Sequence, residues 1–167
     1  FCAIAVHQGR TIQSRSEESV LREVRALSRM SGFSGTISDV GGPTANMYKL
    51  SCKDDKTEHA CRRLSCVHPG VCENLTTDHG PLVRLLRKVR QEPGIKRVYV
   101  ASGVRYDLAT RSPEFIEELA AHHTGGQLSV APEHVDDDVL DKMKKPGIRE
   151  YERFAEQFAC ASEAAGK

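Results

Sequence analysis

The chain has 167 residues and nearly balanced charge, with 24 basic and 23 acidic side chains and a formal net charge of +1. This length fits one ordinary soluble domain or a piece of a larger one, and it excludes a complete eight-unit (β/α) barrel, which needs roughly 250 residues. No apolar run approaches the roughly 18 residues of a membrane-spanning helix, so a membrane protein is not indicated. Basic and acidic residues are interleaved, so no basic stripe favours nucleic acid as a partner.

The two ends predict an internal fragment that is truncated on both sides. The chain opens at Phe1 without a Met, a basic leader or a small-residue cleavage pattern. It closes on a helix-like segment, residues 151–165, followed by Gly166-Lys167. We therefore expect residues 1–167 to form part of a single domain.

A helix and a short strand are predicted first. Ser14 and Glu17 have the spacing of a capping box, and apolar residues then recur at helical period until Gly32 offers a stop. Residues 36–40 are β-prone and run into Gly41-Gly42-Pro43, which is typical of a buried strand followed by a tight loop.

Residues 51–78 lack a periodic apolar pattern and are rich in Cys, His, Asp and Arg, so we expect an inserted loop region there. After this region the sequence again predicts regular elements. A helix at 81–89 is followed by a strand at 97–101 and by a helix that begins at Ser112-Pro113. A strand at 127–131, a helix that begins with the aspartates at 136–138 and a final helix after Pro146-Gly147 complete the order. Strands separated by single helices require parallel pairing with right-handed crossovers, so the fold class is α/β.

In such a sheet, chemistry collects at the carboxyl ends of the strands. At the first end, Gly41 and Gly42 let a ligand approach the backbone closely, but the spacing matches no known nucleotide loop, and the pattern alone favours a structural turn. At the second end, Arg105 is suited to grip a carboxylate or to form a surface pair with Asp107.

The third strand end carries Glu133 beside His134. This pair is suited to proton transfer, to binding a ribose hydroxyl, or to capping the helix that follows. His122 and His123, near a helix C-terminus, are most simply a surface pair that complements the helix dipole.

Six cysteines are present, and four of them crowd into the insertion as Cys52, Cys61, Cys66 and Cys72. No secretory signal precedes them, so metal or redox chemistry in a cytoplasmic protein is favoured over a disulfide framework. Four thiolates in one loop suit zinc or an iron–sulfur cluster, although their spacing matches no recognised zinc motif, and buried unligated thiols are the alternative. We expect Cys160 to pack within the last helix.

Long strings of the sequence follow one another in a distinctive order. They are FCAI at 1–4, HQGR at 7–10, QSRSEES at 13–19, SDVGGPTANMY at 38–48, CRRLSC at 61–66 with Cys72, ASGVRYD at 101–107, APEH at 131–134 and KPG at 145–147. In this order they resemble the YgiQ-type family of radical S-adenosylmethionine (radical SAM) proteins. The resemblance covers essentially the whole chain.

The resemblance implies a partial (β/α) barrel of the radical SAM type, with the cysteine-rich insertion, 51–78, after the first visible strand. In that family a Cys-x3-Cys-x2-Cys loop holds three irons of a [4Fe-4S] cluster, and the fourth iron binds S-adenosylmethionine (SAM). One electron from the cluster cleaves SAM to methionine and a 5′-deoxyadenosyl radical, which abstracts hydrogen from a substrate.

Carried over residue by residue, Cys2 matches the third cysteine of the cluster loop. Gly41 and Gly42 match the glycine pair that meets the methionine amino group of SAM, and Pro43 and Thr44 continue that loop. Ser102, Arg105 and Glu133 occupy strand ends at which such barrels contact the SAM carboxylate or ribose.

Two functions are therefore in view. The first is a radical SAM enzyme of which this chain is the middle portion, served by an electron donor such as flavodoxin or ferredoxin. The isolated fragment is expected to be inactive, because the other two cluster cysteines would precede Phe1. The alternative is a non-catalytic metal-binding module in which the four insertion cysteines form a structural site, holding zinc or a second iron–sulfur cluster. No motif identifies the substrate.

Overall fold

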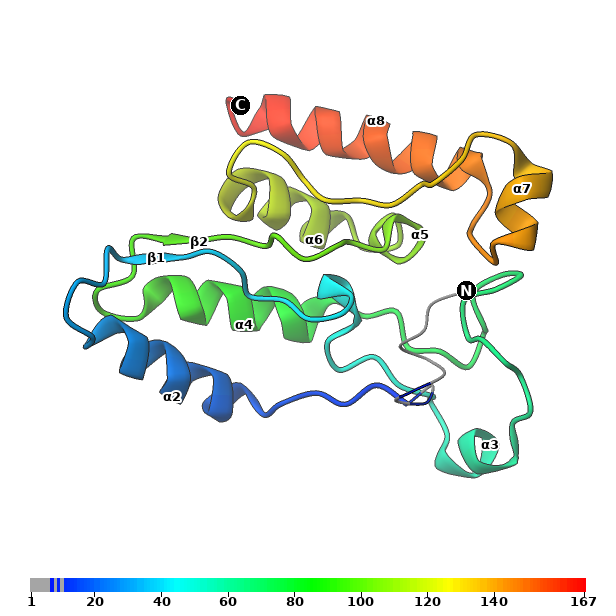
Figure 1. Cartoon of the computed structure of the whole chain (residues 1–167), viewed down its shortest axis with the longest axis horizontal. Coiled ribbons are helices and arrows are strands. Elements are labelled where there is room, and N and C mark those ends of the chain that lie inside the picture. Colours follow the sequence, from blue (N-terminus) through cyan, green and yellow to red (C-terminus); the bar gives the residue numbers. More distant parts are fainter. Residues whose placement is uncertain (1–6, 8, 10) are drawn as a thin grey trace.

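The computed structural model describes His7, Gly9 and residues 11–167, and shows short parallel strands beside a row of helices. Strand β1 (Thr36–Ile37) pairs with β2 (Arg97–Val98), with Thr36 opposite Arg97 and Ile37 opposite Val98. The main helices are α2 (Glu17–Ser28), α4 (Gly80–Gln91), α6 (Pro113–Glu118) and α8 (Ile148–Ala164). Each packs on the next in chain order, from α2 in blue to α8 in red, as successive βα units require (Figure 1).

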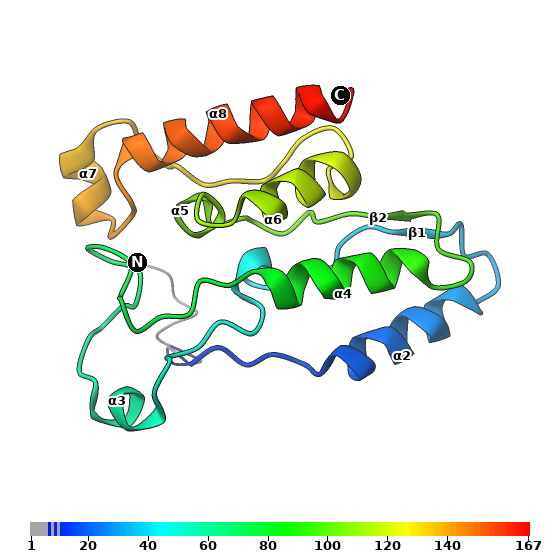
Figure 2. The same cartoon turned by 180° about the vertical axis from the view of Figure 1, so that it is seen from behind.

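The core lies between these helices and the strands. Helix α4 supplies five buried side chains at helical spacing: Leu82, Val83, Leu85, Leu86 and Val89. They pack in one cluster with Val98 of β2 and with Phe115 of α6, which is fully buried. The view from behind shows α4 running along the strands, with α2 on its outer side (Figure 2).

Two of the three predicted strands are present in shortened form, among the residues that the structure describes. Beyond β1, Val40 still donates its backbone N–H to the Tyr99 carbonyl (2.9 Å), so the pairing continues irregularly. The predicted strand at 127–131 is reduced to a parallel bridge between Val104 and Val130. The chain is α/β with a small parallel sheet, as predicted, but glycine and polar residues at the strand ends leave few regular ladder bonds.

The first helix is capped by a different serine from the one predicted. The Ser16 side chain accepts a hydrogen bond from the Ser19 backbone N–H (3.2 Å), whereas the Ser14 hydroxyl accepts from the Lys49 backbone N–H (2.9 Å). Ser14 therefore ties the segment before α2 to a loop that follows β1. The aspartate prediction is confirmed, because Asp136 caps α7 (Asp137–Lys142) with its side chain.

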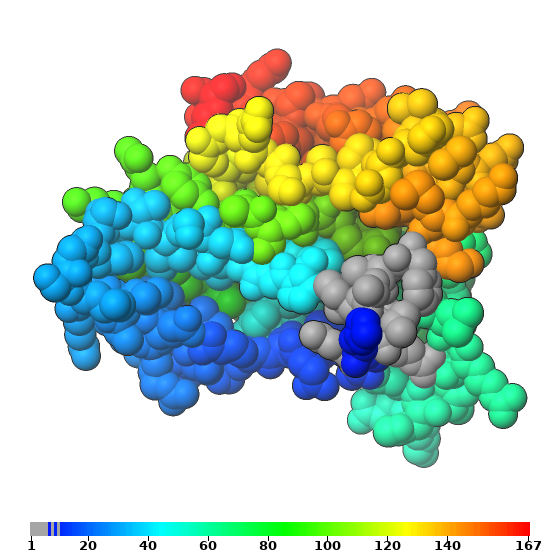
Figure 3. All heavy atoms as spheres, in the orientation of Figure 1, coloured from blue at the N-terminus to red at the C-terminus, as the bar shows by residue number. Residues whose placement is uncertain are grey.

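Residues 51–78, the segment predicted as an insertion and called the insertion below for that reason, carry a short helix, α3 (Asp55–Ala60), that the sequence pattern did not predict. An antiparallel bridge between Cys52 and Leu75 closes the base of the insertion. In the space-filling view the insertion forms a protruding blue-green lobe below the orange residues around α7 (Figure 3). Short helices also occur at Ala45–Met47 (η1) and Tyr106–Ala109 (α5). None of the helices that the structure describes is long and apolar enough to cross a membrane.

Two placements at the helix ends were predicted wrongly. His123 is fully buried instead of lying on the surface, because its ring bonds the Val98 carbonyl (2.9 Å) and Glu118 (3.2 Å). Cys160 is exposed on α8, since the apolar face of that helix is formed by residues such as Phe154.

Glu118 is the centre of a buried ionic cluster at the end of the molecule opposite the insertion. Its carboxylate accepts hydrogen bonds from Arg87 (2.7 Å) and Arg90 (3.2 Å) and lies 3.2 Å from His123 Nε2. Burial opposes ionisation of Glu118, but the bonds from Arg87 and His123 outweigh it and hold the pKa of this carboxyl below its ordinary value.

We expect Glu118→Gln to lower the free energy of unfolding by about 1.5–3 kcal/mol at neutral pH, because charge-assisted bonds are lost. Since the pKa of Glu118 is lowered on folding, its contribution is full above the ordinary value of 4.5 and is lost as the pH falls through the folded pKa. Urea denaturation across pH 3 to 7 should therefore show a weaker acid destabilisation in the variant. Glu114→Gln, at an exposed partner of Arg87, is the control and should change little.

Candidate functional site

A cavity of about 1410 Å³ opens at the carboxyl ends of the strands. Its wall includes the loop after β1 (residues 41–45), the loop after β2 (103–107), the segment before α8 (143–146) and part of the insertion, together with residues 11–15 and one side of α2. This is the place that parallel-sheet topology predicted for chemistry. The loops of two neighbouring strands and the cysteine-rich insertion therefore face one space, which we call the strand-end cavity.

Asp39 joins the ends of β1 and β2. Its carboxylate accepts the backbone N–H groups of Ala101 (2.9 Å) and Ser102 (3.1 Å), and the Ser102 hydroxyl donates to it as well. A Cβ added at Gly41 would lie 2.6 Å from the Ser102 Cβ and 2.7 Å from an Asp39 oxygen, so only glycine fits there. A Cβ at Gly42 would meet nothing within 4 Å. Gly41 thus packs against Ser102, and Gly42 offers bare backbone to the strand-end cavity.

Asn46, which is fully buried, fixes the backbone of Arg105. Its side-chain oxygen accepts the Arg105 N–H (2.8 Å), and its amide nitrogen donates to the Arg105 carbonyl (2.9 Å) and to His79 Nε2 (3.1 Å). His79 Nδ1 lies 3.0 Å from the Thr77 carbonyl, an acceptor only, so the ring carries its proton there and Nε2 accepts from Asn46. Burial lowers the pKa of His79, which favours this neutral ring.

Arg105 and Asp107 form a bidentate ion pair, with N–O distances of 3.0 and 2.7 Å. Asp107 is buried, so the pair is not the surface pair that the sequence also allowed. Arg105 lies in the cavity wall with its charge compensated. Burial, and next the nearby Asp107, raise the pKa of Tyr106 to about 12, so this phenol is neutral at physiological pH.

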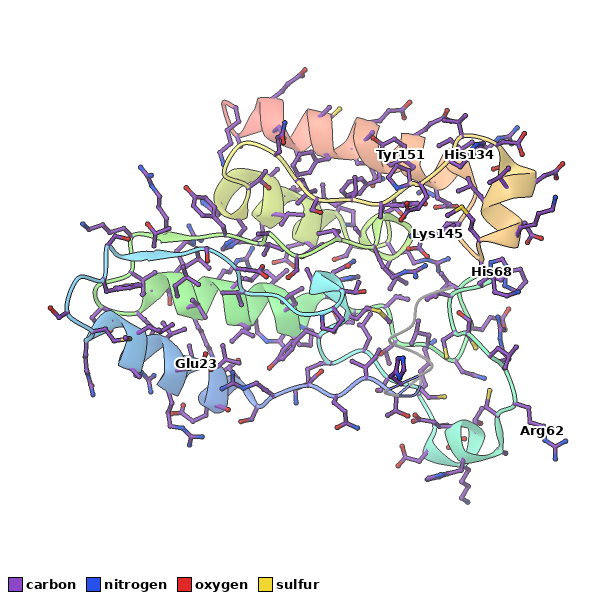
Figure 4. All side chains as sticks on the ribbon, viewed as in Figure 1. Glu23, Arg62, His68, His134, Lys145 and Tyr151 are labelled. Atoms are coloured by element: carbon purple, nitrogen blue, oxygen red, sulfur yellow. The ribbon has the colours of Figure 1, made fainter. Side chains whose placement is uncertain are left out.

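Glu133 is held in a left-handed conformation, with φ of 68°. Such a conformation costs a non-glycine residue of order 1 kcal/mol. Lys145 stabilises the turn, since its ammonium contacts the Glu133 carboxylate (3.1 Å) and the Ala131 carbonyl (3.4 Å). His134 accepts the Asp136 backbone N–H (2.9 Å) just before α7, whereas the cap of that helix is the Asp136 side chain itself (Figure 4). Lys145, and not Glu133, borders the cavity.

The four insertion cysteines all line the strand-end cavity. Among the described residues, however, no group of three or more His, Cys, Asp or Glu side chains is arranged to hold a metal ion. Cys66 and Cys72 instead pack on a small apolar cluster formed by Leu50, Leu75 and Leu108. Cys2, the predicted cluster ligand, lies outside the described residues.

The sequence interpretation missed three residues that build this site, namely Asp39, Asn46 and His79. Asp39 and Asn46 act through backbone groups of residues far away in the sequence, and His79 acts through the Asn46 side chain, which spacing does not reveal. The available signal was a run of polar residues, Asp39 and Asn46, flanking a glycine pair at a buried strand end. The predicted residues Gly41, Gly42 and Arg105 do meet around one cavity.

Comparison with known proteins gives the class. The chain matches the radical SAM superfamily over residues 1–161, and it therefore belongs to that superfamily. No solved structure matches it.

More particularly, the chain is similar to UPF0313 proteins. It is 58% identical to one from Chromobacterium violaceum, 59% to one from Bradyrhizobium diazoefficiens and 53% to UPF0313 protein YgiQ from Salmonella typhimurium, over 100% of this chain in each case. The chain spans 22%, 25% and 23% of the length of these relatives. The family resemblance expected from the sequence is confirmed.

The contrast between the two glycines gives a stability test. We expect Gly41→Ala to lower the free energy of unfolding by about 1–3 kcal/mol, because the added methyl group collides with Ser102 and Asp39. Gly42→Ala is the matched control and should cost well under 1 kcal/mol, since its methyl group enters open space. Urea denaturation of both variants measures the difference, and equal losses would contradict this description of the loop.

Proposed function

We propose that this chain forms part of a radical SAM enzyme that cleaves SAM reductively and uses the product radical for hydrogen abstraction from a substrate. The single observation that carries the proposal is the cavity at the strand ends in a member of this superfamily, with the bare backbone of Gly42 at its edge. The finer architecture belongs to the same proposal: residues 1–167 are part of a (β/α) barrel, and 51–78 are its cysteine-rich insertion.

The residues of the cavity fit SAM in part. Gly41, Gly42, Pro43 and Thr44 would hold its methionine moiety through the backbone, and all four line the cavity. Arg105 also lines it and would contact the carboxylate, although Asp107 already compensates its charge. Ser102 and Glu133 do not line the cavity themselves. Ser102 bonds Asp39, and Glu133 bonds Lys145, and these two partners do line it.

Cys2 would supply one thiolate to a [4Fe-4S] cluster, together with two cysteines from the preceding part of the full-length protein. When bound, such a cluster would supply the single electron needed for reductive cleavage of SAM. The described residues would position the ligand: Asn46 and Asp39 orient the two loops, and the insertion lines one side of the cavity.

The proposal implies a small redox protein such as flavodoxin or ferredoxin as electron donor, and a cytoplasmic location. The alternative proposal is a non-catalytic module in which Cys52, Cys61, Cys66 and Cys72 hold zinc or a second iron–sulfur cluster. Only their shared position on the cavity wall favours it, and the described side chains are not gathered as ligands.

The enzyme proposal is tested on the full-length protein reconstituted with iron and sulfide. Under reducing conditions with SAM we expect 5′-deoxyadenosine, measured by chromatography, and Cys2→Ser should lose both this product and the iron–sulfur absorbance, because one of three thiolate ligands is removed. Cys160→Ser, at the exposed cysteine of α8, is the control and should keep both. A reconstituted, folded protein that forms no 5′-deoxyadenosine would contradict the proposal.

A second test addresses the glycine loop. We expect Gly42→Val to weaken SAM binding by about tenfold or more, equivalent to at least ~1.4 kcal/mol, because its methyl groups occupy space beside the loop. Its thermal unfolding should stay close to that of the wild type, since a Cβ there meets nothing within 4 Å. Gly70→Val adds the same bulk to the insertion side of the cavity, and equal loss of SAM affinity in both variants, by calorimetry, would argue against a role for Gly42.

A further inference from the structure

The geometry points to Cys66 and Cys72 as a reversible dithiol–disulfide pair in the wall of the strand-end cavity. The Cys72 backbone N–H donates to the Cys66 carbonyl with an N–O distance of 2.7 Å. With standard backbone dimensions, such a bond places the two Cα atoms roughly 4.5–6.5 Å apart. A disulfide requires about 4.4–6.8 Å, so the backbone already holds the pair at a bonding distance.

The two cysteines also pack on one apolar surface. Both pack on the apolar cluster of Leu50, Leu75 and Leu108. Among the described residues, Cys52 and Cys61 do not belong to that cluster, although they line the same cavity. The structure therefore selects one pair from the four insertion cysteines, and this choice agrees with the lack of a gathered metal-ligand set in the described part of the chain.

The loop between the two cysteines is held folded from both sides. Val67 and Val71 pack on the same apolar cluster as the cysteines. The Arg63 guanidinium donates to the carbonyls of Ser65 (3.3 Å) and Gly70 (3.2 Å). Closing a disulfide across this loop would fix a conformation that these contacts already favour, so it requires little rearrangement.

The same loop connects the insertion with the rest of the molecule. His68, between the two cysteines, lies 3.5 Å from the Asp141 carboxylate of α7. His68 is seen at the tip of the insertion that faces α7, whereas Arg62 extends outward from its far side (Figure 4). A disulfide between Cys66 and Cys72 would therefore stiffen the part of the cavity wall that reaches α7.

The exchange is a two-electron step with a low-molecular-weight disulfide such as oxidised glutathione as oxidant. The thiolate of one cysteine attacks the glutathione disulfide, forms a mixed disulfide and releases one glutathione thiolate. The second cysteine then attacks the mixed disulfide and releases the other. Two S–H bonds are lost and one S–S bond forms in the protein, while the glutathione disulfide takes up two electrons and two protons.

The test uses the full-length protein, equilibrated without oxygen in mixtures of reduced and oxidised glutathione. Acid quenching, alkylation by N-ethylmaleimide and peptide mass spectrometry then report each thiol. We expect Cys66 and Cys72 to lose reactivity together and to appear as one linked peptide, two hydrogens lighter than the dithiol. Cys160, exposed on α8, should stay outside any intramolecular link.

Variants make the test decisive. In Cys66→Ser we expect the linked peptide to vanish and Cys72 to carry a glutathione adduct instead, and Cys160→Ser should leave the pair unchanged. The inference is overturned if Cys66 and Cys72 react independently across the whole series or link to Cys52 or Cys61. It is also overturned if all four insertion cysteines are blocked by bound zinc or iron in equimolar amount. The readout is thiol mapping, so it stands whether or not the protein cleaves SAM.

Discussion

The structure depends on a single carboxylate that holds two parallel strand ends together. The sheet is too short to do so alone, because β1 and β2 share only two residue pairs. Asp39 supplements the short ladder by accepting two backbone N–H groups from the residues that follow β2. Its presence also explains why position 41 must be glycine: the carboxylate and Ser102 occupy the space that a side chain would need.

A buried polar side chain, Asn46, plays the same part in the next loop. Asn46 pairs with both backbone groups of Arg105, and His79 completes its hydrogen bonds from the start of α4. The stack of His79 on Phe115, with ring centroids 4.9 Å apart, connects this network to the core. The loops of the cavity are therefore positioned by side chains that themselves are locked by packing, which is what precise ligand binding requires.

The fold was largely predictable because its signals are local. The apolar period of α4 and the aspartates before α7 each determine one element without outside help. The strand ends, and with them the place of the cavity, followed from the order of the elements. What failed depends on tertiary contacts: Ser14 lost the cap to Ser16 because it bonds Lys49, and His123 is buried because Val98 and Glu118 satisfy its ring. The polar residues behind the loops escaped notice for the same reason.

The insertion shows most clearly that residues close in the sequence need not converge in space. Four cysteines within one loop suggest a metal because thiolate ligands must converge on one point, and spacing alone cannot say whether they do. Here the bridge between Cys52 and Leu75 and the apolar cluster beneath the loop separate the cysteines by role. Cys66 and Cys72 share a backbone hydrogen bond and pack on the same apolar cluster. This arrangement suits a disulfide between the two better than a metal ion bound by four thiolates. Because this loop also lines the strand-end cavity and reaches α7, a change in its thiol chemistry is placed to alter the shape of that cavity.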